Sequence, residues 1–137
     1  MRVVIDTNCF LAILPKKSIY RPIFDAYRQG KFELVISTDI LNEYAKIFSK
    51  KMSFEISENI IELILKQPNT IESDIYYYWN LIIEDMDDNK YSDLAISANA
   101  EYILTLDRHF DILKTISFPK VKVINLEGFL ALIEAFD

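Results

Sequence analysis

Four acidic residues stand where carboxylates could act together chemically: Asp6, Glu43, Asp93 and Asp107. Asp6 follows a short apolar run rich in β-branched residues, and Asp107 follows a second one, so each is expected just beyond the carboxyl end of a buried strand. In parallel sheets, ligands bind beyond these ends. The two aspartates are therefore predicted to lie at the same rim of a sheet.

Glu43 is the most informative of the four because it interrupts an apolar helical stripe. It lies three residues after Ile40 and four before Ile47, on the face expected to meet the core. Burying an unpaired carboxylate costs several kcal/mol, so a basic partner, a raised pKa or a metal ion is required. No lysine or arginine occupies an obvious pairing position, which favours a metal ion. Asp93 presents a milder case, since it shares a helix face with Ile96.

Hard oxygen ligands of this kind favour Mg²⁺ or Mn²⁺. Four carboxylates can hold one or two such ions, with substrate phosphate completing the coordination shell. Two ions about 4 Å apart can stabilise both the attacking and the leaving oxygen of a phosphodiester hydrolysis. The predicted chemistry is metal-dependent phosphoryl transfer.

Short apolar strands alternating with helices would position these acids. We expect a single domain, residues 1–137, with a three-layer α/β/α fold around a parallel sheet of four to five strands. Strands are expected at 2–5, 33–36, 102–105 and 120–124, with a short one possible at 68–71, and helices at 38–48, 55–66, 74–84, 90–99 and 126–136.

Composition narrows the function classes. Only two glycines occur, which excludes a glycine-rich phosphate loop and a dinucleotide fingerprint. The single cysteine, Cys9, allows no internal disulfide, and we find neither a transmembrane run nor a signal peptide, so a cytoplasmic protein with no membrane association is expected. The net charge of -6 argues against nucleic-acid binding unless bound cations supply positive charge where phosphate must sit.

Four stretches resemble the PIN-domain nucleases, in particular the branch formed by toxin components of toxin-antitoxin systems: VVIDTNCF, LNEYAKIF, DMDDNKYSDLAISANAEYILTLDRHF and VKVINLEGFL. The resemblance spans almost the whole chain. It implies metal-dependent cleavage of RNA, an antitoxin partner, and a metal-ligand set comprising Asp6, Glu43, Asp93 and Asp107. It also implies supporting roles for Asn8 and Thr105.

Other polar residues near these motifs have simpler explanations. Asp87 and Asp88 stand where a helix starts, so capping accounts for them, with a direct metal role for Asp88 as the alternative. His109 is interpreted as a surface or capping group and left out of catalysis. Cys9 is expected to be a small buried hydrophobe.

The run 76–79, Tyr-Tyr-Tyr-Trp, could stack on unpaired bases, but packing and a homodimer interface explain it better. The available phosphate contacts are Lys16, Lys17, Arg21, Lys46, Lys50 and Lys51, which would serve equally as solvated surface.

Two alternatives to a ribonuclease remain: a metal-dependent phosphatase or other phosphoryl-transfer enzyme, and a catalytically silent binding domain. A dehalogenase-type phosphatase would place a second aspartate two residues after the first, where this chain has Asn8. A silent domain would tolerate loss of the acids.

Overall fold

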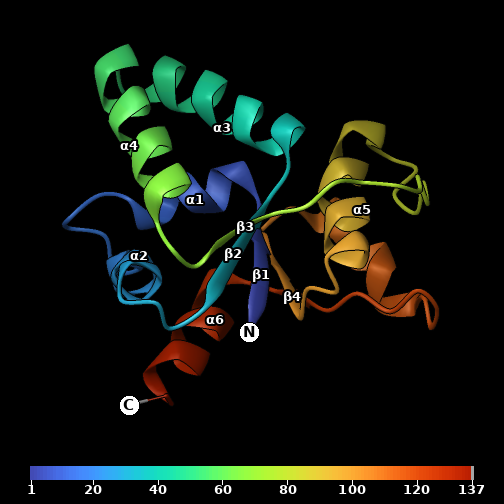
Figure 1. Cartoon of the computed structure of the whole chain (residues 1–137). Helices are drawn as coiled ribbons and strands as arrows, with labels where there is room; N and C mark the ends of the chain where they lie inside the picture. The colour runs from blue at the N-terminus through green and yellow to red at the C-terminus, as the bar shows by residue number, and fades with distance from the viewer. Residues whose placement is uncertain (137) are drawn as a thin grey trace.

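The computed structural model describes residues 1–136, which pack around one five-stranded parallel sheet with strand order β3-β2-β1-β4-β5 (Figure 1). The strands are β1 (Arg2–Ile5), β2 (Glu33–Ile36), β3 (Thr70–Glu72), β4 (Tyr102–Leu104) and β5 (Val123–Ile124). Every neighbouring pair is parallel. The predicted fold class is confirmed, and the short strand considered at 68–71 is present as β3.

The central strand β1 is buried on both faces, because Val3, Val4 and Ile5 are almost completely inaccessible. This explains its continuous apolar sequence, which is typical of parallel sheets covered on both sides. From β1 the sheet grows through β2 to β3 on one side and through β4 to β5 on the other. The strand order therefore reverses beside β1, and a crevice is expected between the carboxyl ends of β1 and β4.

Helices cover both faces, as predicted. They are α1 (Thr7–Ile13), α2 (Arg21–Arg28), α3 (Thr38–Lys51), α4 (Phe54–Lys66), α5 (Asn89–Ser97) and α6 (Leu126–Glu134), with 3₁₀ turns η1 (Met86–Asp88) and η2 (Arg108–Thr115). In Figure 1, α1, α2 and α6 lie on one side of the sheet and α5 on the other. The sequence reasoning did not anticipate α2. No helix within residues 1–136 has the length and apolar character that a bilayer span requires.

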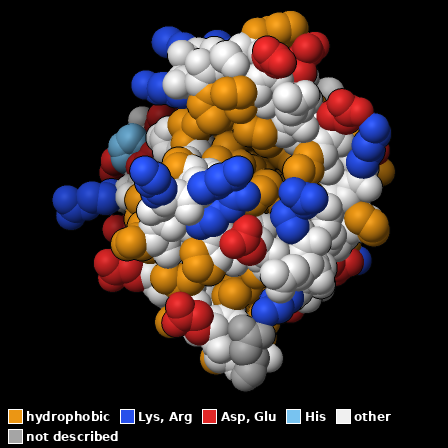
Figure 2. Space-filling view, turned by 90° about the vertical axis from the view of Figure 1, so that its left-hand side faces the viewer, with side chains coloured by type: hydrophobic (Ala, Val, Ile, Leu, Met, Phe, Trp, Pro, Cys, Tyr) orange, Lys and Arg blue, Asp and Glu red, His pale blue; other side chains and the backbone are white. Residues whose placement is uncertain are grey.

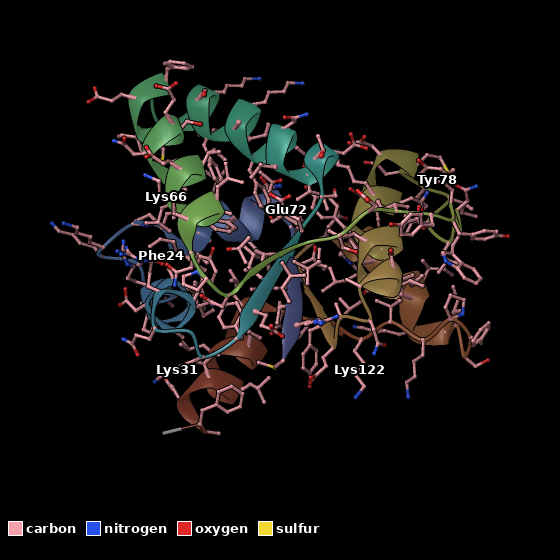
Figure 3. The ribbon with its side chains drawn as sticks, in the orientation of Figure 1. Phe24, Lys31, Lys66, Glu72, Tyr78 and Lys122 are labelled. Carbon is pink, nitrogen blue, oxygen red and sulfur yellow. The ribbon has the colours of Figure 1, made fainter. Side chains whose placement is uncertain are left out.

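The prediction of a helix at 74–84 is wrong. This segment, which we call the strap, has no helical or strand structure and runs from β3 to η1 alongside α5 (Figure 1). Asn80 adopts a positive φ of 52°, a conformation that ends any helix passing through it. Tyr78, Leu81 and Ile82, which such a helix would place on one face, therefore do not share a helical stripe. Tyr78 is exposed and lies with the strap beside α5 (Figure 3).

A cluster of aromatic rings packs α3 against α1. The Phe10 ring lies 5.0 Å from Tyr44 and 5.5 Å from Phe48 between centroids, and the Tyr44 and Phe48 rings stack 5.6 Å apart. The Tyr44 hydroxyl donates a hydrogen bond to the backbone oxygen of Ile5 at the end of β1. The residue before Tyr44 is Glu43, so this packing brings Glu43 to the carboxyl end of β1.

Candidate active site

Asp6 and Asp107 meet through the hydroxyl of Thr105. The Thr105 hydroxyl donates to Asp6 Oδ2 at 2.9 Å and accepts a hydrogen bond from the Asp107 N–H at 3.0 Å. The backbone N–H of Asp6 in turn donates to the Leu104 oxygen at 2.9 Å, which ties the ends of β1 and β4 together. The structure thus joins the two aspartates that the sequence predicted at one rim.

The Asp6 carboxylate lies in a strongly acidic environment. Its residue is 9% exposed, and its side chain does not cap α1. Burial raises the pKa of Asp6; the hydrogen bond from Thr105 opposes this rise, and the charges of Asp107 and Glu43 add to it. Asp6 is therefore close enough to Glu43 and to Asp107 to be repelled by both.

Asp88 joins this group. Burial raises its pKa to about 6, and the charges of Asp107, Asp85 and Asp6 contribute further. Its Oδ2 is buried without a hydrogen-bond partner, and its side chain makes no capping bond to α5. The interpretation of Asp88 as a cap is therefore wrong. Asp85 caps η1 instead, accepting from the Asp87 N–H at 3.1 Å.

Asp93 does not reach this acidic group. Its carboxylate Oδ1 accepts a hydrogen bond from the Trp79 N–H at 3.0 Å, and the residue is only 2% exposed. Burial raises the pKa of Asp93 and the Trp79 hydrogen bond lowers it, with no contribution from another acid among residues 1–136. The structure therefore places this predicted ligand against the strap.

Asp93 is one of three polar residues on α5 that hold the strap. Asn89 accepts from the Ile82 N–H at 2.8 Å and donates to the Ile82 oxygen at 2.9 Å, while Ser97 donates to the Asp74 oxygen at 2.5 Å. Asn89, Asp93 and Ser97 are spaced four residues apart and so share one helix face. This polar stripe gives the strap hydrogen bonds that a helix would have supplied internally.

Glu43 has a basic partner, contrary to the sequence reasoning. Lys90 Nζ lies 2.6 Å from Glu43 Oε1. The other carboxylate oxygen, Oε2, accepts hydrogen bonds from the hydroxyls of Thr7, at 2.7 Å, and Tyr91. The lysine was missed because it comes from α5, 47 residues further along the chain.

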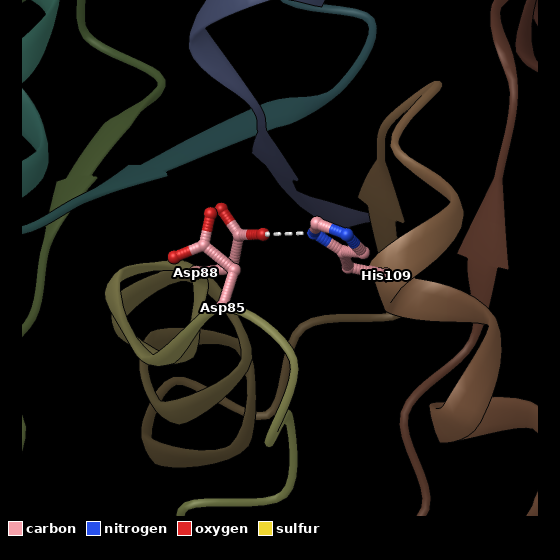
Figure 4. A group of neighbouring side chains, drawn as sticks. All are labelled: Asp85, Asp88 and His109. Carbon is pink, nitrogen blue, oxygen red and sulfur yellow. Dashed lines mark ion pairs between the residues drawn. The ribbon is translucent and has the colours of Figure 1, made fainter.

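His109 lies among the acids, although the sequence reasoning left it out. Its Nδ1 is 3.5 Å from Asp88 Oδ2 (Figure 4). The same atom is 3.4 Å from Asp107 Oδ1. Desolvation lowers the pKa of His109, but the charges of Asp107, Glu84 and Asp88 outweigh it and the pKa is raised. The sequence signal was its position two residues after Asp107, whose carboxylate caps the η2 turn by accepting from the His109 N–H.

The comparisons with known proteins agree with this arrangement of elements. A family model described as the PIN domain matches residues 2–109, a range that includes all the acids described above. The chain belongs to the PIN-domain family. No curated protein matches the chain in sequence.

Solved structures share the fold of this PIN domain. VapBC2 from Rickettsia felis bound to a promoter DNA fragment is 22% identical, with 91% of this chain and 98% of that chain covered and a TM-score of 0.61. DNA-bound VapBC from Salmonella typhimurium is 16% identical, with 92% and 98% covered and a TM-score of 0.62. VapBC-1 from nontypeable Haemophilus influenzae is 17% identical, with 93% and 99% covered and a TM-score of 0.59.

The acids of this PIN domain fit a divalent cation. Asp6, Asp88 and Asp107 repel one another, and His109 lies beside only two of them, so a bound cation would relieve repulsion that His109 alone leaves. A second possible donor set shares Asp88: atoms of Asp85, Asp88 and His109 lie within 4.8 Å of one another (Figure 4). The first set offers only hard oxygen ligands, which suit Mg²⁺ or Mn²⁺.

A cavity of about 380 Å³ opens beside Asp107 of this PIN domain. Its lining includes Thr105 and Leu106 at the end of β4, Arg108 and Lys114 from η2, and Asn125 before α6. A substrate segment lying in this cavity would pass directly beside the acidic group.

Two further predicted residues of the PIN domain lie close in sequence but differ in environment. Asn8 is exposed, and its side chain forms no hydrogen bond within residues 1–136. It therefore does not hold any of the acidic side chains in place. Cys9 is fully buried, and burial raises the pKa of its thiol to about 12. A thiol with such a pKa is inert at neutral pH, as expected for a buried hydrophobe.

Proposed function

We propose that this PIN domain is a metal-dependent endoribonuclease and the toxin of a toxin-antitoxin pair. The observation that carries the enzymatic part is the convergence of Asp6, Asp88 and Asp107. Burial and the charge of Asp107 raise the pKa of both Asp6 and Asp88, and Asp88 Oδ2 is buried without a hydrogen bond. Such a group is suited to bind Mg²⁺ or Mn²⁺.

We assign the ligand set to Asp6, Asp88 and Asp107, with Glu43 at the same rim. Asp88 replaces Asp93 in this set because the Asp93 carboxylate is committed to the backbone of Trp79. A bound divalent ion would lower the pKa of a water molecule and neutralise charge on the scissile phosphate. It would also supply the positive charge that a chain of net charge -6 otherwise lacks.

The chain's own residues would position the substrate and the acids. Thr105 holds the Asp6 carboxylate in a fixed orientation through its 2.9 Å hydrogen bond. His109, between Asp88 and Asp107, carries a positive charge when protonated and would limit the repulsion between them. Arg108 and Lys114 line the neighbouring cavity and offer cationic contacts for RNA phosphates.

The experiment that tests this function is cleavage of defined single-stranded RNAs by the purified protein with Mg²⁺ or Mn²⁺. We expect products with a 5′-phosphate and a 3′-hydroxyl, and no cleavage after metal removal or in the Asp6→Asn variant. A phosphatase would instead release inorganic phosphate from small phosphomonoesters. Undiminished RNA cleavage by Asp6→Asn would contradict the proposed site.

The toxin assignment rests on the family and on the likeness to three VapBC structures. A partner-binding surface is compatible with the exposed apolar side chains Phe54, Ile56 and Leu65 of α4. The face in Figure 2 combines apolar side chains with a band of Lys and Arg. Co-expression with the product of a neighbouring small open reading frame should yield a stable complex and relieve growth inhibition; failure with every neighbouring frame would oppose the toxin assignment.

A further inference from the structure

Among the residues that the structure describes, Lys90 is the one cation that lies partly buried where α3 and α5 border the site. Its ammonium lies 2.6 Å from Glu43 Oε1, and its side chain is only 18% exposed. It also lies 3.0 Å from Asp87 Oδ2, but that carboxylate is 75% exposed. Exposed ion pairs contribute little, so the half-buried pair with Glu43 is the one that fixes the lysine.

The rest of the Glu43 carboxylate is also committed. Its Oε2 accepts from the hydroxyls of Thr7 and Tyr91, and these two hydroxyls lie 2.6 Å from each other. Tyr91 is the next residue on α5 after Lys90, and its ring lies 5.7 Å from the ammonium. Three contacts from two separate helices therefore hold both oxygens of Glu43.

Asp6, Asp88 and Asp107 differ from Glu43 in their partners. Asp6, Asp88 and Asp107 have no lysine or arginine partner among residues 1–136, and Asp88 Oδ2 lacks any hydrogen-bond partner. The acidic rim thus has two electrostatically different parts. On one side Lys90 neutralises Glu43. On the other side three aspartates share only the imidazole of His109, which lies 3.5 Å from Asp88 and 3.4 Å from Asp107 and carries charge only when protonated.

We propose that the Lys90 ammonium occupies the place that a second metal ion would need at Glu43, so that this PIN domain binds one divalent ion. Asp6, Asp88 and Asp107 hold that ion, and Lys90 is a positioning residue that keeps Glu43 out of the coordination shell. The inference rests on the proposed function and deepens it, because it sets the number of ions. A divalent ion at Glu43 would have to displace a lysine held at 2.6 Å, or lie beside it at a strong electrostatic disadvantage.

The test is Mn²⁺ binding to the apo protein, followed by the electron paramagnetic resonance signal of free Mn²⁺, a readout independent of RNA cleavage. We expect one ion for the wild type, one for Lys90→Arg and two for Lys90→Met, which frees Glu43. The matched control is Lys66→Met, which removes the same charge from a surface pair in which Lys66 and Glu62 are both largely exposed. It should leave the number at one.

Two ions bound to the wild type, or one bound to a folded Lys90→Met protein, would overturn the inference. No ion bound to the wild type would overturn the proposed metal site itself, so the two failures are distinguishable. Circular dichroism and thermal melting establish whether Lys90→Met folds.

A second variant keeps the inference open to refutation if Lys90→Met does not fold. Glu43→Gln should still bind one Mn²⁺ with a Kd within about threefold of the wild type, since the carboxylate it loses is outside the coordination shell. Asp88→Asn should bind the ion at least about 100-fold more weakly. Loss of the ion in Glu43→Gln would show that Glu43 is a direct ligand and would overturn the role given to Lys90.

Discussion

The carboxylate of Asp93 accepts the backbone hydrogen bond of Trp79 at 3.0 Å, which turns this acid towards the strap and away from the rim of the sheet. Asp88, five residues earlier, has a buried oxygen without a partner and interacts with Asp6 and Asp107. Two acids in one motif therefore lie in different surroundings: Asp93 holds the strap, and Asp88 faces the other acids.

Exchanging each acid for its amide should separate these roles. We expect Asp88→Asn to cleave RNA at least about 100-fold more slowly. Loss of a residue that only hydrogen-bonds to a metal ligand already costs about 10- to 100-fold, and loss of a direct ligand should cost at least as much. Asp93→Asn keeps an oxygen that can accept from Trp79 and should retain cleavage within about threefold. Cleavage rates at saturating Mn²⁺ measure both, and the reverse ranking would restore Asp93 as the ligand.

Removing the hydrogen bonds to the strap should loosen it without changing the site. Asn89→Ala leaves both backbone groups of Ile82 unpaired, and Ile82 is fully buried, so the free energy of unfolding should fall by about 2 kcal/mol or more. Hydrogen exchange should quicken across 74–84 before it does in β1. Ser49→Ala, a substitution on α3 away from the strap, is the control; equal effects of both variants would contradict the role of the polar stripe.

The stability of the metal-free protein should decrease as the pH rises through about 6. The pKa of Asp88 is raised to about 6 from 3.8, so the protonated form is favoured by folding. This contribution is complete below about pH 4 and is lost above about pH 6. In EDTA at pH 7.5, Asp88→Asn should therefore be more stable than the wild type by roughly 2 kcal/mol, and this advantage should vanish near pH 4.

Metal should reverse that ranking. At pH 7.5, Mn²⁺ stabilises the wild type by binding only to the folded state, whereas Asp88→Asn should gain little. Thermal unfolding of both proteins at pH 4, 5.5 and 7.5, with and without Mn²⁺, provides the measurement. A Tm of the metal-free wild type that rises steadily across this range relative to Asp88→Asn would refute the assignment.

The hydrogen bonds of the Thr105 hydroxyl should matter more for metal binding than the volume of the Thr105 side chain. Thr105→Val removes the hydrogen bond that lowers the pKa of Asp6 and leaves the Asp107 N–H unpaired, so Mn²⁺ binding near pH 6 should weaken about tenfold or more. Thr105→Ser retains the hydroxyl and should bind nearly as the wild type does. Calorimetric titration of the three proteins would decide; similar weakening by both variants would indicate that packing, not the hydroxyl, is responsible.

The sheet and the ends of its strands could be predicted because the signals are local. Buried parallel strands have continuous apolar sequences, and the carboxyl end of β1 directly precedes Asp6. Ser37 accepts a capping bond from the Ile40 N–H, which confirms the predicted start of α3. The apolar stripe drew attention to Glu43, but its partner Lys90 lies in another helix and leaves no trace near it in sequence.

The strap could not be predicted because its hydrogen bonds come from elsewhere in the chain. Its apolar residues follow a helical spacing, yet Asn89, Asp93 and Ser97 bind its backbone and Asn80 takes a positive φ. For a related reason, the sequence alone could not tell which of Asp88 and Asp93 faces the other acids. Five residues correspond to a rotation of about 140° around a helix, so the two face different ways, and the sequence does not say which way is the rim.

The Thr105 hydroxyl has one proton, and this proton points at Asp6 Oδ2 because the Asp107 amide occupies the oxygen's other side. Protonation of Asp6 would leave this hydrogen bond in place but would remove the negative charge that a metal ion needs. Proton and metal ion then exclude each other from a group whose pKa burial has already raised. Loading the site near pH 6 in weakly buffered solution should therefore release protons, because Asp88, whose pKa is raised to about 6, must lose its proton to bind the ion.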